Sequence, residues 1–327
     1  MGTALSKANL LSDTVKEALE LEQSDPTVND ALYALSQKGS PAELHVLADT
    51  GTTVTLTKSG KTLSATVGSD GYAILYPSEL GDWTMVYTYD GTQKTRIYTL
   101  EVIGIVYVYP FVIGDSLDDT EWADIAICSE LGMAEQFFKV GDTKTVNING
   151  TNYEVQIIGF NHDTKTAGGK AGITFQLVDC LTTAYPMNSS NTNVGGWTSS
   201  VMRQTTLKTI LSQLPSALQS VLKAVNKLTS AGNQSTTINT TSDKLFLLSE
   251  IEIFGTTTYS VAGEGSQYEW YMAGNSKIKY RSGSANAWWE RSPRSGDTTA
   301  FCYVNGSGTA GNNVASASYG VSFGFCV

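Results

Sequence analysis

The histidines are the first residues to consider for chemistry, because a Ser-His-Asp or Cys-His arrangement needs a histidine base. The chain has two, His45 and His162. His45 lies in a stretch of short predicted strands, so the two are not expected to meet. His162 is followed by a Gly-Gly pair at 168–169, which is typical of a turn. A loop or supporting role for His162 is favoured, and a catalytic or metal-binding role is the alternative.

Carboxylates are the second candidates, since a pair of acids is sufficient for glycosidase chemistry. Glu250 and Glu252 are two residues apart and are expected to share one face of a strand. Further acids are scattered after them: Glu264, Glu269 and Glu290. No spacing favours a paired-acid site, so no catalytic residue and no cofactor is predicted.

Metal ligation has two candidate groups of side chains. The four cysteines, which lack CxxC spacing, do not predict a zinc site. They are Cys128, Cys180, Cys302 and Cys326. Buried free thiols are favoured in a reducing compartment, and a Cys302–Cys326 bridge stays open. The acids between 115 and 119 lack EF-hand spacing and fit a solvated helix start better than a calcium site.

The stretch from Trp288 to Val327 has the pattern of a binding module. Residues 321–327 alternate with the two-residue period of a strand, and 299–304 predict a second strand. Between the Trp pair and the final strand lies a run rich in Gly, Asn, Ser and Thr, with aromatic residues among them. A rigid frame that carries such a surface is typical of recognition.

These residues also carry a resemblance. Trp288-Trp289-Glu290-Arg291-Ser292-Pro293, the strand Phe-Cys-Tyr-Val and the ending Gly-Val-Ser-Phe-Gly-Phe-Cys resemble a domain family of bacteriophage and bacterial surface proteins. The segment Ser-Asp-Lys-Leu-Phe-Leu-Leu-Ser at 242–249 is similar to the same family. The resemblance covers residues 112–327. It implies a fold related to C-type lectins, in which retroelement-diversified phage proteins present their variable residues.

The resemblance implies structural roles for Trp288, Trp289, Arg291 and Pro293. Arg291 is expected to bond backbone carbonyls or an acid, with ligand capture as the alternative. Adjacent strand residues face opposite sides, so at most one Trp could stack on a sugar. The implied ligand-contacting positions are Thr299, Phe301, Tyr303, Asn305, Ser307, Asn312, Asn313, Ser316, Ser318 and Tyr319. An ordinary Gly/Asn-rich loop without diversification stays open as the alternative.

Composition excludes some classes of function. The formal net charge of −10 and the lack of Lys/Arg clusters argue against nucleic acid binding. A charged fraction of 16% suits β-rich surface or virion proteins. No apolar run approaches the roughly 20 residues of a membrane span, and no secretory signal is predicted at the start. We therefore expect a protein of the phage particle surface that is assembled in the cytoplasm of the bacterial host.

A multidomain α+β fold in three parts is predicted. Residues 1–40 have apolar residues at helical spacing, which predict short helices for attachment or oligomerisation, or helices that pack on their own chain. Residues 41–110 alternate evenly between Gly- and Asp-rich turns and resemble an immunoglobulin-like β-sandwich. Residues 111–327 are predicted to form the C-type-lectin-like ligand-binding domain.

Within 111–327 the pattern predicts four elements. They are a helix at 121–138, a hairpin at 144–158 with an Asn149-Gly150 turn, a strand at 173–178, and a helix at 205–228 that Pro215 breaks or restarts.

Together these patterns favour a non-enzymatic virion protein of a phage tail, fibre or capsid surface that binds a host-surface glycan or protein. Its other expected partners are further virion proteins and copies of itself, with a trimer as one option. No metal and no membrane insertion are expected. The alternatives are a purely structural decoration or cement protein and a cell-wall glycan hydrolase.

Overall fold

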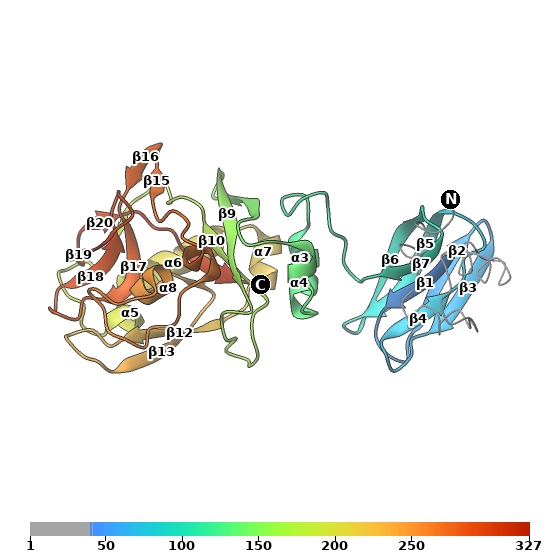
Figure 1. Ribbon diagram of the computed structural model, residues 1–327, viewed down its shortest axis with the longest axis horizontal. Helices are drawn as coiled ribbons and strands as arrows, with labels where there is room; N and C mark the ends of the chain where they lie inside the picture. The colour runs from blue at the N-terminus through green and yellow to red at the C-terminus, as the bar shows by residue number, and fades with distance from the viewer. Residues whose placement is uncertain (1–39, 41) are drawn as a thin grey trace, which may run out of the picture. The chain divides into compact units, whose positions relative to one another are not determined.

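The computed structural model describes residues 40 and 42–327 (Figure 1). The fold is β-rich, with 40% strand and 16% helix arranged in several sheets. The chain divides into two compact units, Met1–Pro110 and Phe111–Val327. The helices expected over 1–40 lie outside the described residues, apart from Ser40 at the edge of the first strand. In the described part of the chain, no helix is both long and apolar enough to cross a bilayer.

The N-terminal unit consists of two sheets that share one hydrophobic core. The first sheet has the order β3 (Lys61–Thr66), β2 (Thr53–Lys58), β5 (Gly81–Tyr89) and β6 (Thr92–Leu100), all antiparallel. The second sheet has the order β4 (Tyr72–Leu75), β1 (Ala42–Leu47) and β7 (Gly104–Val108), and β1 runs parallel to β7.

Alternation along these strands places one face of each sheet in the core. Trp83 and Met85 of β5 and Leu44 and Val46 of β1 are all buried in this core. Two hairpins close on Ser59-Gly60 and Asp90-Gly91, where both turn residues have positive φ. Two-residue turns of this kind match the right-handed twist of the strands.

The centre of the C-terminal unit is a five-stranded sheet that includes the end of the chain. Its order is β14 (Leu245–Phe246), β21 (Gly324–Cys326), β10 (Ile173–Leu177), β9 (Thr151–Phe160) and β8 (Thr143–Ile148). Phe175 of β10 stacks on Phe325 of β21 with ring centroids 5.2 Å apart. The last residues are therefore a buried structural element of this unit.

The remaining strands of this unit form smaller sheets. One has three strands, β17 (Trp288–Pro293), β18 (Ala300–Val304) and β19 (Ala310–Val314). The others are the pairs β11 (Tyr185–Pro186) with β20 (Ser318–Tyr319), β12 (Val225–Ser230) with β13 (Ile238–Asp243), and β15 (Lys279–Arg281) with β16 (Ser284–Asn286).

The helices of the C-terminal unit are short. They are α3 (Trp122–Glu130), α4 (Ala134–Phe137), α5 (Gly196–Ser199), the π-helix η1 (Met202–Thr206), α6 (Leu207–Gln213), α7 (Ser216–Val221), α8 (Glu250–Phe254) and α9 (Glu269–Met272). The helix predicted at 121–138 is two helices, and Gly132 between them has a φ of 70°. Pro215 is the N-cap of α7 and separates it from α6, as predicted, because proline lacks the backbone N–H that a continuous helix would need.

Two sequence predictions are wrong in this region. The helical pattern of 205–228 ends at Val221, and β12 begins at Val225. Glu250 and Glu252 lie in α8, not on a strand. The Ser249 hydroxyl caps this helix, and Glu252 returns a bond to the Ser249 backbone, so a capping box sets the helix start.

The Asn149-Gly150 turn generates the first prediction. Gly150 has a φ of 85°, where a Cβ costs about 1–2 kcal/mol in conformational energy. We expect Gly150→Ala to lower the free energy of unfolding by about this amount, measured by urea denaturation. Gly306→Ala is the control, because Gly306 lacks a positive φ and its added Cβ would lie 3.5 Å from the nearest atom. Equal effects of the two substitutions would contradict the prediction.

Candidate functional site

Arg291 of β17 lies at the centre of the C-terminal unit and is fully buried. Its guanidinium donates to both carboxylate oxygens of Glu252, one of them at 2.8 Å. It also donates to the Thr229 hydroxyl at 2.9 Å and to the backbone oxygens of Leu247 at 3.0 Å and Glu264 at 2.8 Å. Arg291 thereby bonds both an acid and carbonyls, and it joins β17 to α8, β12 and two loops.

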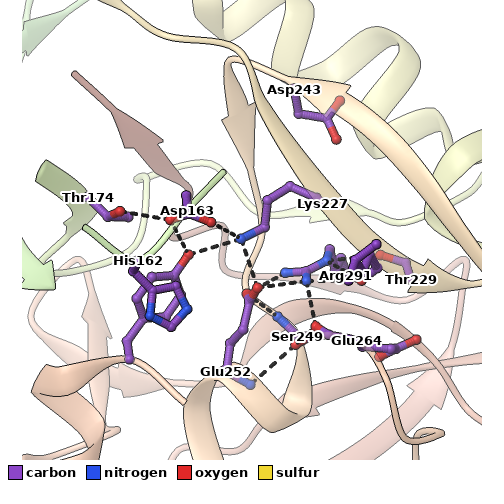
Figure 2. A network of polar contacts seen from close by, with 12 residues as sticks. His162, Asp163, Thr174, Lys227, Thr229, Asp243, Ser249, Glu252, Glu264 and Arg291 are labelled. Atoms are coloured by element: carbon purple, nitrogen blue, oxygen red, sulfur yellow. Dashed lines mark hydrogen bonds and ion pairs between the residues drawn. The ribbon is translucent and has the colours of Figure 1, made fainter. Parts of the chain in front are cut away.

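Lys227 of β12 continues this network (Figure 2). Its ammonium lies 2.7 Å from Glu252 Oε1 and 2.7 Å from Asp163 Oδ1. The second oxygen of Asp163 accepts from the hydroxyls of Thr174 at 2.7 Å and Tyr268 at 2.8 Å. We call Asp163, Lys227, Glu252 and Arg291 the ion network.

The charges in the ion network determine the pKa values of its acids. Burial alone would raise the pKa of Asp163, but the Lys227 ammonium and its hydrogen bond hold this pKa well below its usual range. Burial alone would also raise the pKa of Glu252, but Arg291 and Lys227 together lower it below its usual value. Both acids are therefore ionised at neutral pH, so two anions face two cations inside the protein.

Glu264 lies beside the ion network in a different environment. Its carboxylate accepts from the Ser292 hydroxyl and from the Ser230 backbone N–H at 2.7 Å. Burial nevertheless raises its pKa to about 7, although these hydrogen bonds oppose the shift. Glu264 is thus close to its titration midpoint at neutral pH.

Glu290 and Glu250 are also fully buried. Among the hydrogen bonds of the described residues, none reaches either carboxyl oxygen of Glu290. Burial, with Glu250 and Glu264 nearby, raises its pKa far above the usual value, so Glu290 is a neutral acid. Glu250 instead accepts backbone N–H groups from Tyr259 and Ser260 and the Ser260 hydroxyl at 2.7 Å. Each of these carboxyl groups lies inside the fold.

His162 stacks on Tyr268 with ring centroids 4.0 Å apart. Burial lowers its pKa, so the ring is neutral at physiological pH. The ring lies against the Tyr268 that bonds Asp163, which gives His162 a supporting position beside the ion network.

In the part of the chain that the structure describes, no group of three or more His, Cys, Asp or Glu side chains could hold a metal ion. The four cysteines are buried and free, so Cys302 and Cys326 form no bridge.

The Trp pair of β17 is fully buried on both faces of the strand. Trp288 Nε1 donates to the Lys277 backbone oxygen at 3.0 Å, and Trp289 Nε1 donates to that of Tyr185 at 2.9 Å. Pro293, at the end of the strand, is buried as well. Neither indole presents a face to solvent for sugar stacking.

Above Trp289 lies a group of partly exposed side chains, which we call the tyrosine patch: Tyr303, Asn313 and Tyr319. The two tyrosine rings are 4.9 Å apart at a tilt of 34°, and the edges of both meet Trp289. The Asn313 amide donates to the Tyr319 hydroxyl. Gly311 lies opposite Tyr303 on β19, and a Cβ there would be 2.8 Å from the Tyr303 ring. The missing side chain leaves space for the ring to lie across the strand.

The other predicted contact positions differ in their placement. Phe301 lies on β18 between the paired residues Pro293 and Asn313 and is fully buried, so its expected role in contacting a ligand is wrong. Asn312 faces the opposite side of β19 from Asn313, since adjacent strand residues alternate. Ser318, next to Tyr319, is exposed.

Three further positions are held by local hydrogen bonds. Asn305 Oδ1 accepts from the backbone of Ser307 and Thr309 and closes the β18–β19 turn, with Ser307 exposed at its tip. Thr299 donates its N–H and hydroxyl to Asp297. The Ser316 hydroxyl donates to Asn191. Asn305, Thr299 and Ser316 therefore shape the surface that surrounds the tyrosine patch.

The chain from Thr298 to Val327 contains no Asp, Glu, Lys, Arg or His. The tyrosine patch therefore belongs to a stretch without charged side chains. Such a stretch suits contact with a neutral ligand, since an ionic ligand would need an opposite charge to replace its hydration.

Sequence reasoning anticipated the bonds of Arg291 but missed its partners in the ion network, although two patterns pointed to them. Lys227 lies between Val225 and Thr229 at two-residue spacing, so a strand here would turn it toward the core. Ser249 followed by Glu252 is the capping-box spacing that marks a helix start. Neither pattern identifies the partners of Lys227, which come from distant parts of the chain.

Residues 171–327 match the model of a family described as a domain of unknown function, DUF6273. The match includes the Trp-Trp motif, the segment at 242–249, most of the ion network and the tyrosine patch. No curated protein and no solved structure matches the chain.

The ion network predicts a large cost for replacing Arg291. Lysine cannot make the paired bonds to Glu252 while also reaching the carbonyls, so several buried acceptors would lose their donor. We expect Arg291→Lys to lower the free energy of unfolding by about 3–5 kcal/mol in guanidinium denaturation. Arg294→Lys is the matched control, because the Arg294–Asp297 pair is partly exposed and should matter by about 1 kcal/mol or less. Similar small losses for both variants would exclude the structural role of Arg291.

Glu264 predicts a pH dependence of stability. Its pKa is raised from 4.5 to about 7 on folding, so its contribution is complete below about pH 4.5 and is lost as the pH rises through about 7. Glu264→Gln removes the titrating group and keeps a neutral acceptor. Between about pH 5 and pH 8, the wild type should lose about 2.5 kcal/mol more stability than the variant. Denaturation curves at both pH values measure this, and equal slopes would contradict it.

Proposed function

We propose that this protein is a bacteriophage virion component whose C-terminal unit presents the tyrosine patch to a ligand on the host surface. One observation carries the proposal: the partly exposed side chains of the tyrosine patch lie beside β17, a buried strand that the ion network holds in place. Tyr303 and Tyr319 rest on Trp289, and β17 carries both Trp289 and Arg291 of the ion network. A contact surface held in place before binding loses little conformational entropy when the ligand arrives.

The residue types of the tyrosine patch support a recognition role. Tyrosine offers a large contact area with few rotatable bonds and a hydroxyl for hydrogen bonding. Asparagine can both donate and accept hydrogen bonds. Tyr303, Tyr319 and Asn313 combine these properties in one place, and the exposed Ser318 adds a hydroxyl beside them.

The proposed fold assignments are an immunoglobulin-like sandwich for residues 41–110 and a C-type-lectin-like domain for 111–327. The first is supported by two sheets of four and three strands around one core. The second is supported by the return of the C-terminal strand to the central sheet and by the short strands β18, β19 and β20, which carry the tyrosine patch outside that sheet. In this proposal the N-terminal unit attaches the protein to other virion proteins or to further copies of the chain.

The proposal is for binding without turnover. The acids that the sequence offered for glycosidase chemistry are used inside the fold: Glu252 in the ion network, Glu264 with Ser230 and Ser292, and Glu250 with the 259–260 backbone. Each of these acids is fully buried or nearly so. Binding at the tyrosine patch requires none of them to change protonation.

Binding of the fluorescently labelled full chain to whole cells of the host bacterium tests the proposal. We expect Tyr303→Ala and Tyr319→Ala each to weaken binding about tenfold or more, since buried aromatic anchors contribute over about 1.4 kcal/mol at interfaces. Tyr107→Ala is the control, because Tyr107 is 45% exposed and lies in the N-terminal unit. Undiminished binding by both patch variants, or no binding by the wild type, would reject the proposal.

A further inference from the structure

A second candidate binding surface is a hollow of about 140 Å³ in the C-terminal unit. It lies where the β8–β9 turn, the end of α6 and the loop at 181–185 meet. We call it the threonine hollow. Its lining residues are Ile148, Asn149, Thr151, Tyr153, Leu181, Thr182, Thr183, Tyr185, Ile210 and Gln213.

The lining residues of the threonine hollow are all uncharged. Ile148, Leu181 and Ile210 are buried beneath it, whereas Thr182, Thr183 and Gln213 are exposed around it. Hydroxyl and amide groups can each donate and accept, so together they match a ligand that carries many hydroxyl groups. A charged ligand would lose hydration here without gaining a partner of opposite charge.

The walls of the threonine hollow are tied to one another. The Tyr153 hydroxyl lies 3.1 Å from the Thr182 hydroxyl and accepts the Thr182 backbone N–H at 3.3 Å. The Asn149 backbone N–H donates to the Gln213 backbone oxygen at 3.4 Å. These bonds connect three separate segments, so the polar groups are positioned before a ligand arrives.

The threonine hollow adjoins the tyrosine patch through one strand pair. Tyr185, which lines the hollow, is directly opposite Tyr319 in the β11–β20 ladder. The backbone oxygen of Tyr185 also accepts from Trp289, the floor of the patch. A ligand with several repeating units could therefore contact both places.

We propose that the threonine hollow is a binding site for a neutral carbohydrate and that the host ligand is a neutral glycan. The sugar hydroxyls bond Thr182, Thr183 and Gln213, and the ring of Tyr153 or Tyr185 supplies an apolar surface. This inference rests on the proposed function, because it takes the same face of the unit to be the one that meets the host. The inference adds two things to the proposed function: a class of ligand, and a binding site that lies outside residues 298–327.

An array of immobilised neutral and acidic glycans, probed with the full chain, tests the inference. We expect retention by neutral glycans. The double variant Thr182→Val/Gln213→Ala should bind them about tenfold or more weakly, because it removes two hydrogen-bonding side chains. Thr240→Val is the matched control, since Thr240 is exposed on β13 and does not line the hollow. Thermal unfolding of each variant establishes that the fold is retained.

Three outcomes overturn the inference: retention by acidic glycans only, no retention by any glycan, or wild-type affinity of the double variant for neutral glycans. Whole cells separate this failure from that of the proposed function. If cells bind through Tyr303 and Tyr319, but binding survives periodate oxidation of cell-surface glycans and is lost on protease treatment, the ligand is a protein. The carbohydrate inference then fails and the proposed function stands. If neutral glycans bind at the hollow but host cells do not bind, the proposed function fails alone.

Discussion

The C-terminal unit depends on the paired hydrogen bonds between the Arg291 guanidinium and the Glu252 carboxylate. Both groups are removed from water, so each is tolerated only while the other is present. Lys227 and Asp163 extend the same dependence to β12 and to the turn before β10. A shift of any one of these segments would leave a buried charge unpaired, and the arrangement of the unit is therefore fixed as a whole.

This constraint separates the interior of the unit from its surface. The interior holds the ion network and the neutral acid Glu290, whereas the segment from Thr298 onward has no charged side chain. Trp289 connects the ion network to the tyrosine patch, because it lies two residues before Arg291 on β17 and its ring contacts those of Tyr303 and Tyr319. The residues of the tyrosine patch could therefore change without altering the ion network, which suits the recognition role that we propose for them.

Local patterns were read correctly where the interactions are local. The Asn149-Gly150 hairpin follows from the positive φ that both turn residues adopt. The helix predicted over β12 is wrong, because the conformation there depends on residues far away in the chain. Leu228 is 37% exposed and Lys227 is 1% exposed, which inverts the usual preference of both side chains. A helical pattern that extended to Leu228 could not foresee that Lys227 would be buried between Asp163 and Glu252.

By itself, the sequence determined the strand-rich composition and the turns, because backbone preference and periodicity act over a few residues. The structural role of the Trp-Trp-Glu-Arg-Ser-Pro segment was an implication of the family resemblance. Only the tertiary structure decided which side chains meet. It buried Phe301, brought Tyr303 and Tyr319 together, and placed Glu252 between Arg291 and Lys227. These pairings join residues far apart in the chain, and burial, which sets their strength, is a property of the folded whole.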